Sequence, residues 1–563
     1  MLTELKKFFS GNRFVPLFLI VSIFAVGLFH NPAAFAAGAV LCIYLSVAVH
    51  KNGELRFVSG LPSISVALIA FSYFATIIWA VDSGVALFGF FRYLAVFLFM
   101  VVMMQKNAPS KDALFSVVAY SGAVMTLISV VFMHIEPVEQ YFSVAGRLAG
   151  FWQYPNSFAM LLLCGMIVLL TKERIRVWDY VALAVLAFGM FYSGSRIALA
   201  VAFVSIFAVI LFRRGKKVKI IIGAFVLIGV IAALVYVFAS GNMYLITRFL
   251  STSLTESTFV GRILYVADAM PLVIRYPFGM GYFGYYFTHN GVQTGVYELS
   301  FVHNDFLQLV LDIGWIPSLV FIAAIIKTFF RKGTSLRIRV LLFAICAHSF
   351  FDFDLQFIAM MMILVLCLDF DCGKALILKK RRGISYAVAG ILCAVLVYFN
   401  IAQSAYLLGN TGLSYSMYRG DTLSAVHILI NETDVDKSLE LSESILRRNP
   451  YCTVAASVKA RSSFSKGDLP TAMEYKNKVL EMSPFAYDEY KEYCQMLVYS
   501  IQLYTRAGDT YSADICKKEL GNVVAKLEGL DDKVSKLGKM IKDQPKTQLT
   551  GEISVLVKEY LNK

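Results

Sequence analysis

The sequence of 563 residues has few charged residues and lacks the signatures of several soluble enzyme classes. Only 16% of the residues are Asp, Glu, Lys or Arg, whereas 58% are hydrophobic. There is no P-loop, and no glycine-rich dinucleotide fingerprint follows a predicted strand. No set of His, Cys and carboxylate residues has the spacing of metal ligands. The sequence therefore predicts neither a metal site nor a cofactor.

The nine cysteines contain no C-x-x-C pair and no paired spacing. Six of them lie in or beside hydrophobic runs, and Cys452, Cys494 and Cys516 lie on predicted helices near the C-terminus. A disulfide framework is not expected from this distribution, although one bond among the last three cysteines stays open.

Hydrophobic runs long enough to cross a bilayer dominate the first 404 residues. The first follows Lys6, Lys7 and Arg13 like a signal peptide, but a second run comes almost at once and favours a retained anchor. The sequence predicts an all-α, polytopic membrane protein with about 12–13 transmembrane helices. The thirteen runs are 14–29, 32–49, 63–81, 84–104, 112–133, 156–171, 177–193, 195–212, 218–240, 303–329, 336–350, 354–371 and 384–404.

Basic residues indicate the orientation of these helices. Of the 31 Lys and Arg residues before position 405, 25 lie at the N-terminus or in every second connector. The positive-inside rule assigns that side to the cytoplasm. Residues 405–563 contain 21 basic and 21 acidic residues and are predicted to form a soluble domain on the outer side. Nucleic-acid binding is not expected, because the excess of positive charge is spread over short membrane connectors.

The six basic residues left over are all arginines in outer connectors or within a hydrophobic run. A guanidinium can grip a phosphate or carboxylate at two points, which lysine cannot do. The alternative is that these arginines lie at the membrane interface without a binding role. The six are Arg92, Arg147, Arg196, Arg248, Arg262 and Arg275.

The longest outer connector, 241–302, leads into a polar start of the tenth run. Residues 261–275 have helical spacing with Arg262 at the start, and the Gly/aromatic stretch YPFGMGYFGYY follows. An attacking acceptor hydroxyl needs a base, a role that suits a histidine such as His303, although a capping or interfacial histidine is the simpler alternative. Asn304 and Asp305 can act as N-caps. Asp312 lies nine residues into the run and is expected to face a bundle interior or cavity.

A second polar stretch, AHSFFDFDLQF, contains His348, Asp352 and Asp354 at the predicted outer end of two runs. These residues could pair with arginines or bind a cation. Transfer chemistry on the outer side needs an activated donor that has already crossed the membrane. A lipid diphosphate fits, because arginines can stabilise the charge of its leaving group.

Four segments in this order resemble the O-antigen ligases, with the related O-antigen polymerases and protein O-glycosyl ligases. They are GRLAGFWQYPNSFAMLL (146–162), YSGSRIALA (192–200), GRILYVADAMPLVIRYPFGMGYFGYY (261–286) and FVHNDFLQLVLDIGW (301–315). The resemblance covers roughly residues 60–370 and implies an inverting, metal-independent glycosyltransferase of the bacterial cytoplasmic membrane. Its donor would be an undecaprenyl-diphosphate-linked glycan, and its acceptor a glycan, lipid or protein hydroxyl on the outer face.

The resemblance also implies roles for individual residues. Arg196 and Arg262 would grip the diphosphate, and His303 would activate the acceptor hydroxyl. Further substrate-binding candidates are Arg92, Arg147, Asn156, Asn304 and Asp312. The family core usually has about twelve spans, so a thirteenth would place the C-terminal domain outside.

The C-terminal segment 405–563 shows the pattern of tetratricopeptide repeats. An Asn-Pro or Ser-Pro pair recurs at 449–450 and 483–484, and a Gly-Asp turn recurs at 467–468 and 508–509. Two or three helical pairs fit into 435–525. Such repeats act as scaffolds or recruit a protein partner, and the sequence does not separate these roles.

Three classes of function remain open from the sequence. The first is a ligase or a polymerase of lipid-linked glycans, which differ only in the acceptor. The second is a flippase for the same lipids, although residues 1–404 show no internal repeat and the polar residues lie toward the outer side. The third is a membrane-anchored interaction module, which leaves the outer arginines and Asp312 unexplained.

Overall fold

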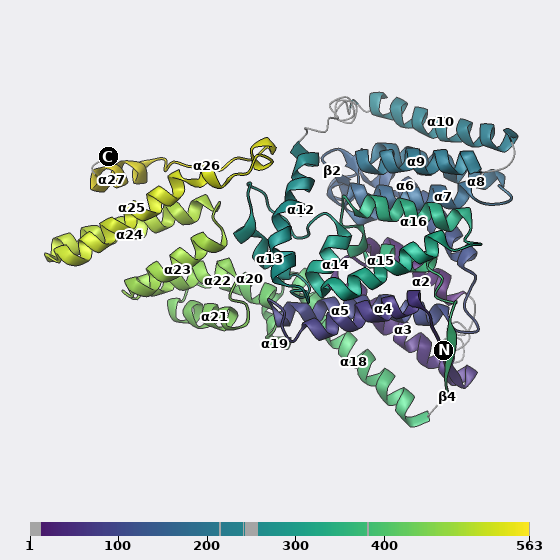
Figure 1. Ribbon diagram of the computed structural model, residues 1–563, viewed down its shortest axis with the longest axis horizontal. Helices are drawn as coiled ribbons and strands as arrows, with labels where there is room; N and C mark the ends of the chain where they lie inside the picture. The colour runs from purple at the N-terminus through teal and green to yellow at the C-terminus, as the bar shows by residue number, and fades with distance from the viewer. Residues whose placement is uncertain (1–12, 213–215, 240, 242–256, 380–381, 562–563) are drawn as a thin grey trace. The chain divides into compact units, whose positions relative to one another are not determined.

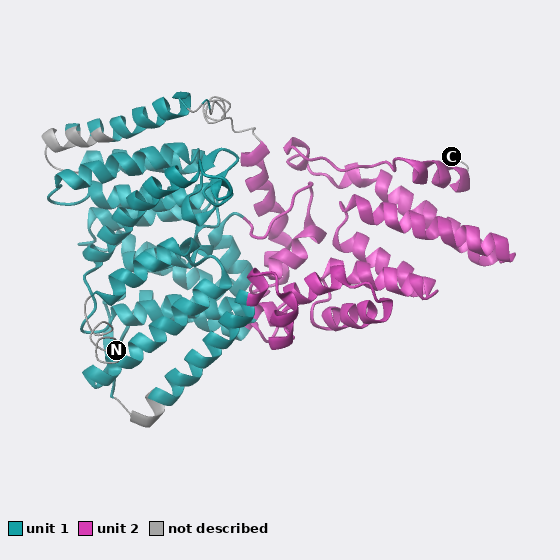
Figure 2. Ribbon diagram, turned by 180° about the vertical axis from the view of Figure 1, so that it is seen from behind, with its two compact units in different colours: residues 1–75, 87–252, 303–404 teal, residues 76–86, 253–302, 405–563 magenta. Residues whose placement is uncertain are grey.

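The computed structural model describes residues 13–212, 216–239, 241, 257–379 and 382–561. Arg248 and several basic residues that contribute to the predicted orientation lie outside the described residues: Lys6, Lys7, Arg213, Arg214, Lys380 and Arg381. The chain divides into two compact units (Figure 2). Unit 1 comprises 1–75, 87–252 and 303–404, and unit 2 comprises 76–86, 253–302 and 405–563. Unit 2 therefore combines most of the predicted outer connector with the predicted soluble domain.

Unit 1 is a bundle of apolar helices (Figure 1). A helix begins within each of the thirteen predicted runs or within a few residues of its start, which confirms the predicted helical membrane fold. The helices are α2 (Phe14–Phe24), α3 (Asn31–Asn52), α4 (Leu61–Thr76), α5 (Ser83–Met103), α6 (Lys111–Phe132), α7 (Pro155–Leu170), α8 (Val177–Tyr192), α9 (Arg196–Phe212), α10 (Lys216–Ala239), α14 (Asp305–Ile313), α15 (Trp315–Phe330), α16 (Leu336–Ser349), α17 (Ile358–Cys367) and α18 (Arg382–Leu407).

Helix lengths vary more than the sequence indicates. Among the described residues, five helices are long and apolar enough to cross a membrane by themselves: α3, α5, α6, α12 and α18. The run 303–329, predicted as one span, is broken into α14 and α15 at Gly314, whose φ of 85° and ψ of 178° favour glycine. The polar residues that precede α14 therefore lead into a short helix of nine residues.

Helix α7 lies at the centre of unit 1. All of its residues except Asn156 are buried, and it packs against α6, α8, α9 and α16. Gly165 permits a close helix crossing, because a Cβ there would lie 3.1 Å from the Cα of Ala119 on α6. This dense packing fixes the N-terminal end of α7, which carries Asn156.

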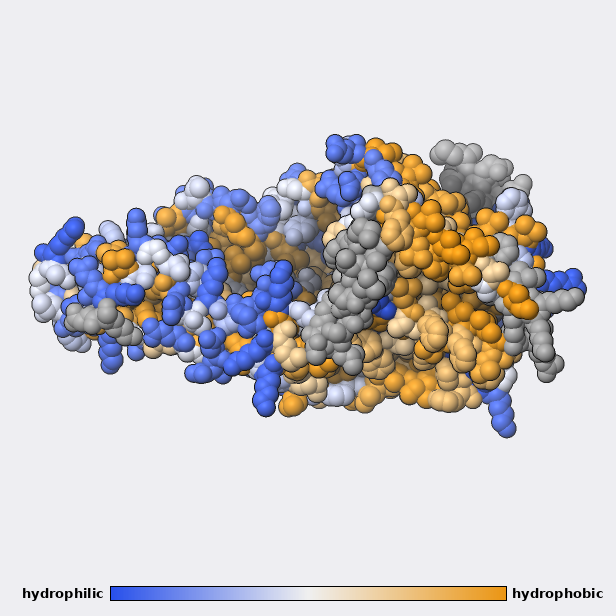
Figure 3. Space-filling model, turned by 90° about the horizontal axis from the view of Figure 1, so that it is seen from above, coloured by the Kyte–Doolittle hydropathy of each residue, from blue (hydrophilic) through white to orange (hydrophobic). Residues whose placement is uncertain are grey.

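The outer surface of unit 1 is hydrophobic, whereas the C-terminal helices expose mainly hydrophilic residues (Figure 3). On α9, Phe203, Phe207 and Leu211 follow one another at helical spacing and are exposed by 75%, 59% and 58%. A contiguous apolar surface of this kind is suited to contact with lipid chains. Unit 1 thus has the surface of a multi-pass membrane protein.

A two-stranded antiparallel sheet joins distant connectors of unit 1. Strand β1 (Glu54–Ser59) pairs with β4 (Lys374–Lys379), with Glu54 opposite Lys379 and Ser59 opposite Lys374. A Cβ on Gly60 would lie 2.0 Å from the carbonyl oxygen of Cys372, so only glycine permits this close approach of the two segments of the chain.

Unit 2 consists of helices and the connector segments that pack with them. Asn449 and Ser483, each followed by proline, end α21 and α23, as expected for residues that precede a proline. The helices are α12 (Ser257–Arg275), α13 (Gly284–Thr288), α19 (Thr411–Met417), α20 (Thr422–Asn431), α21 (Val435–Arg448), α22 (Thr453–Ser465), α23 (Leu469–Met482), α24 (Tyr487–Ala507), α25 (Thr510–Glu528), α26 (Leu530–Lys533) and α27 (Glu552–Leu561).

Neighbouring helices of this series pack in pairs, with α21 against α22, α22 against α23 and α24 against α25. A buried cluster of Leu, Tyr, Cys and Val side chains from α23, α24, α25 and α27 forms the core of the last part. All nine cysteines of the chain are free thiols, including Cys452, Cys494 and Cys516.

Helix α12 is apolar enough to qualify as a membrane span by length and composition, although it lies within the predicted outer connector. Several of its contacts are with other segments of unit 2. Asp268 is 5% exposed and accepts hydrogen bonds from Thr294 and from the Tyr297 hydroxyl, and Val260 and Leu264 pack on Ile541. Helix α12 thus contacts both polar connector residues and the C-terminal segment, and it packs as part of unit 2.

Candidate functional site

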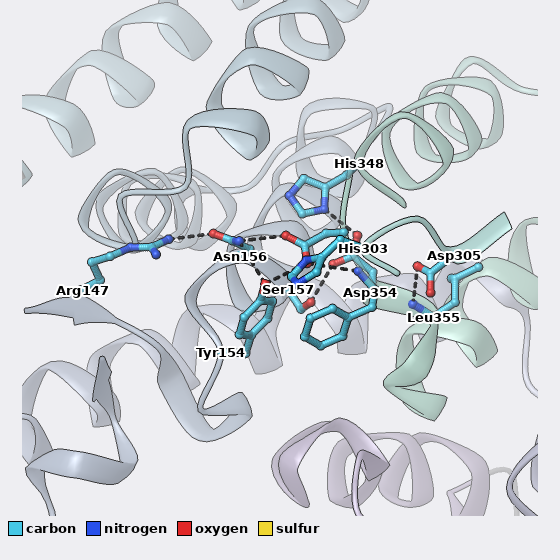
Figure 4. A network of polar contacts seen from close by, with 11 residues as sticks. Arg147, Tyr154, Asn156, Ser157, His303, Asp305, His348, Asp354 and Leu355 are labelled. Carbon is cyan, nitrogen blue, oxygen red and sulfur yellow. Dashed lines mark hydrogen bonds and ion pairs between the residues drawn. The ribbon is translucent and has the colours of Figure 1, made fainter. Parts of the chain in front are cut away.

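The site begins with a short hairpin that presents Arg147. Strands β2 (Ser143–Val144) and β3 (Arg147–Leu148) are joined by Ala145 and Gly146, whose φ angles of 49° and 70° are typical of a mirror-image two-residue turn. The Nε of Arg147 donates to the carbonyl oxygen of Ser193 at 2.7 Å, and its Nη2 donates to Asn156 Oδ1 at 2.7 Å. Arg147 thereby joins the start of α7 to the turn that precedes α9. Figure 4 shows its contact with Asn156.

Asp352 is the centre of the polar network. Its carboxylate accepts hydrogen bonds from Asn156 Nδ2 at 2.8 Å and from the Tyr154 hydroxyl at 2.8 Å. Its side chain is only 1% exposed. Pro155 occupies the first turn of α7 and fixes the backbone between Tyr154 and Asn156, so both side chains reach the same carboxylate.

His303 is the partner of Asp352 from the other side. Its Nδ1 lies 3.3 Å from Asp352 Oδ1, and its ring meets Phe353 edge to face with centroids 5.0 Å apart. His303 has a φ of 53°, a left-handed conformation that is uncommon for histidine and tends to occur at functional sites. The side chain is 19% exposed, so the ring can be reached while its orientation is held.

This pairing has a chemical consequence. A carboxylate at Nδ1 favours the tautomer in which Nδ1 carries the proton and Nε2 is basic. Nε2 is then the nitrogen able to take a proton from an acceptor hydroxyl. The pair of His303 and Asp352 has the form of a general base with an orienting carboxylate.

A second, fully buried layer supports this pair. Asp354 accepts a hydrogen bond from Ser157 at 2.7 Å and pairs with His348 at 2.5 Å. Asp305 accepts from the backbone N–H of Leu355 at 2.8 Å. The contacts tie α7, α14 and α16 to the segment that carries Asp352. The sequence leaves pairing with an arginine or a cation open for His348 and Asp354, and in the structure these two side chains contact each other.

Arg196 begins α9 directly after the turn that Arg147 holds. Gly194 has a φ of 60°, and Ser195 caps the helix with its hydroxyl 3.4 Å from the N–H of Ala198. The half-buried Arg196 therefore lies at a helix N-terminus, where backbone N–H groups and the helix dipole also favour an anion. The predicted pieces around Arg147, Asn156, Arg196 and His303 all belong to unit 1 and lie on connected elements.

Three further predicted residues have structural partners. Arg92 is 1% exposed, and its guanidinium donates to the carbonyl oxygens of Phe29 and Gln356, whereas its contact with substrate stays a prediction. Asn304 Oδ1 caps α14 through the N–H of Leu307, as its alternative role predicts. Asp312 is buried in the bundle interior, as expected, and accepts from Tyr73 and Gln308.

Arg262 lies in unit 2, near the start of α12, where it is half-buried. Its neighbour Tyr265 packs on Tyr297 of the same unit, with ring centroids 4.6 Å apart. Among the described residues, no group of three or more His, Cys, Asp or Glu side chains is arranged to hold a metal ion.

The sequence does not assign Asp352 or Tyr154 to the predicted site. Asp352 stands out only as a possible partner of an arginine or a cation, and it lies 49 positions from His303. Tyr154 belongs to the segment 146–162 but gives no separate signal. The local sequence spacing does not predict the contacts of either residue, because these contacts form between segments that meet only in the folded bundle.

The fold and the site together define a multi-pass α-helical membrane protein with a histidine–aspartate pair beside an arginine-bearing helix start. The sequence model of a protein family described as O-Antigen ligase matches residues 181–322 of this chain. The matched segment includes Arg196, Arg262, His303, Asn304 and Asp312, and it ends before Asp352. No curated protein matches the sequence.

Proposed function

We propose that the protein transfers an undecaprenyl-diphosphate-linked glycan to an acceptor hydroxyl at the outer face of the bacterial cytoplasmic membrane. One observation carries the proposal above all. A hydrogen-bonded chain runs from His303 through Asp352 and Asn156 to Arg147, which holds the turn before Arg196. The proposed base and the helix start that would bind phosphate are thus parts of one network. The family match over 181–322 supports the same class of reaction.

The proposed reaction is a single displacement. His303 Nε2 takes the proton of the acceptor hydroxyl as its oxygen forms a bond to the anomeric carbon of the glycan. The bond from that carbon to the diphosphate oxygen breaks, and undecaprenyl diphosphate leaves with the electron pair. Attack from the side opposite to the leaving group inverts the anomeric configuration.

Arginines would stabilise the charge that develops on the departing diphosphate. Arg196 and Arg262 are the proposed ligands, with Arg147 close to the same turn. Arg92, buried on backbone carbonyls, instead holds the connectors around the site in place. Asn304 has a similar indirect role, because its cap positions the helix that follows His303.

The C-terminal helix pairs support a tetratricopeptide-type scaffold as part of this proposal. Their repeated proline-terminated helices and Gly-Asp turns are typical of such scaffolds. In this view residues 405–563 lie outside the membrane, where they could bind a protein partner of the envelope.

The lipid-linked glycans of cells that lack the gene test the proposal. Long polymer left on undecaprenyl diphosphate is the expected result for a ligase, since the final transfer is lost. Single repeat units on the carrier would instead assign chain growth to this protein, as a polymerase. An unchanged pool of lipid-linked glycans on the outer face would contradict both.

A further inference from the structure

Unit 2 contains a cavity of about 550 Å³ that no part of the proposed reaction uses. Its first wall is the end of the outer connector, 286–300, and its second wall is formed by α20, the start of α22 and the turn between α23 and α24. The volume lies within the usual range of ligand sites. Residues that decide its chemistry are Tyr286, Asn290, Tyr297, Glu298, Thr453 and Phe485.

The connector wall is held in place by its own contacts. His289, which also lines the cavity, is 3% exposed and uses Nδ1 on the carbonyl oxygens of Tyr285 and Tyr286, at 3.2 and 3.0 Å. Gln293 donates to the carbonyl oxygen of Tyr297 at 2.5 Å. Within the described part of the chain, Nε2 of His289 is buried without a hydrogen-bond partner.

The lining is suited to carbohydrate. Aromatic side chains offer flat apolar surfaces on which a sugar ring can lie, and amide, hydroxyl and carboxylate groups can bind sugar hydroxyls. Among the described residues that line this cavity there is no Lys or Arg. A phosphate would meet Glu298 without a balancing cation, so the diphosphate is disfavoured here.

We infer that the cavity between residues 286–300, helix α20, the start of α22 and the turn between α23 and α24 is a binding subsite for uncharged sugar residues. The inference rests on the proposed function, because it assigns the bound sugars to the glycan that is transferred or to the glycan that accepts it. Ser300, on the cavity wall, precedes His303 by three positions in the chain.

Binding to the full-length protein in detergent tests the inference. One probe is the oligosaccharide released by mild acid from the lipid-linked pool of wild-type cells, and the other is the envelope polysaccharide of the same cells. Saturation-transfer NMR with wild-type protein should detect binding of at least one probe. Asn290→Ala removes a polar contact, and Val454→Trp places a ring at a lining position that is 37% exposed. Each variant should weaken binding at least about tenfold, as loss of roughly 1.4 kcal/mol would.

Tyr511→Ala is the matched control, because Tyr511 is 77% exposed and lies on α25, away from the cavity lining. Its affinity should equal that of the wild type, and thermal unfolding should confirm that all variants are folded. Binding of the first probe alone assigns the site to the donor, and binding of the second alone assigns it to the acceptor. Binding of neither probe, or equal binding by the cavity variants, overturns the inference.

His303→Ala separates this inference from the proposed function. That variant should bind the glycan as the wild type does, while it no longer transfers it. If the cavity variants bind the glycan as the wild type does, and the protein transfers glycan, only the assignment of the subsite is wrong. If glycan binds in the cavity but deletion of the gene leaves the lipid-linked glycans unchanged, only the proposed reaction is wrong.

Discussion

Asn449 donates a hydrogen bond to Asp82 at 3.0 Å, although 367 positions separate the two residues. Both side chains are buried in unit 2. Asp82 also accepts from the N–H groups of Gly84 and Val85 at the start of α5, so one carboxylate caps a helix and holds the end of α21. The stretch 76–86 is in this way fastened to the C-terminal helices of its own unit.

Asp82→Ala should therefore destabilise the protein. Loss of a helix cap costs about 1 kcal/mol, and a buried amide left without its acceptor costs about 1–3 kcal/mol. We expect the free energy of unfolding to fall by about 2–4 kcal/mol in total, measured by denaturant titration in detergent. The control is Asp468→Ala, which removes an exposed cap on α23. An equal loss in both variants would show that the buried bond to Asn449 adds nothing.

His303→Ala tests the proposed base. Turnover should fall by about 10²- to 10⁴-fold, the usual contribution of general base catalysis, while binding of the lipid-linked donor stays close to that of the wild type. Transfer of radiolabelled glycan and donor binding measured on the same preparation separate the two effects. Full activity would exclude His303 as the base, and loss of donor binding would make it a substrate-holding residue.

Asp352→Asn tests the orienting carboxylate. The amide is close in size, but it can donate to His303 Nδ1 and so favour the tautomer with the proton on Nε2. We expect kcat to fall by roughly 10³- to 10⁴-fold with little change in KM. Unchanged kcat would limit Asp352 to a structural role beside Tyr154 and Asn156.

Arg262→Lys and Arg196→Lys test the proposed grip on the diphosphate. Each variant keeps the charge but loses the two-point geometry of the guanidinium. Activity should fall by about 100-fold in each variant, comparable to the loss of one donor for a developing oxyanion. Arg419→Lys, on an exposed turn before α20 in unit 2, is the matched control and should retain wild-type activity. Wild-type rates in Arg262→Lys would mean that charge alone is enough at this position.

His289 should make the stability of unit 2 depend on pH. Burial lowers its pKa below the ordinary value of 6.5, while nearby Glu298 and two backbone carbonyls act in the opposite direction. The unfolded chain therefore takes up a proton at a higher pH than the folded chain. This contribution to stability is complete above the unfolded pKa and is lost as pH falls from about 6.5 toward the folded pKa.

Thermal unfolding between about pH 7.5 and about pH 5.5 measures this dependence. His289→Gln should reduce the shift of the midpoint across that range. The exposed His427 provides the control, and His427→Gln should shift with pH as the wild type does. An identical pH dependence in all three proteins would assign the acid sensitivity to other groups.

Much of the fold follows from local patterns in the sequence. The hydrophobic runs predict the helices of unit 1, and the proline pairs at 449–450 and 483–484 predict the helix ends after α21 and α23. The break between α14 and α15 is not predicted, because Gly314 lies inside a continuous apolar run. The backbone conformation of Gly314, which breaks the helix, is known only from the structure.

The site is predictable in its parts and not in its connections. Arg147, Asn156, Arg196 and His303 are predicted from short segments, whereas the carboxylate that contacts both Asn156 and His303 comes from the distant connector after α16. Arg92 shows the opposite case, since its position in an apolar run suggests a ligand contact while its guanidinium is used on backbone carbonyls. Long-range hydrogen bonds decide both outcomes, and no local spacing encodes them.

The pairing of β1 with β4 has a consequence for the biogenesis of the protein. Residues 54–59 leave the ribosome early, and the strand that completes their hydrogen bonds is made only after residue 373. Until then the backbone N–H and C=O groups of β1 have no partner strand, and unpaired strand edges are prone to pair with wrong segments. The order of synthesis therefore allows β1 and β4 to pair only after the chain between them, with most helices of the bundle, has been made.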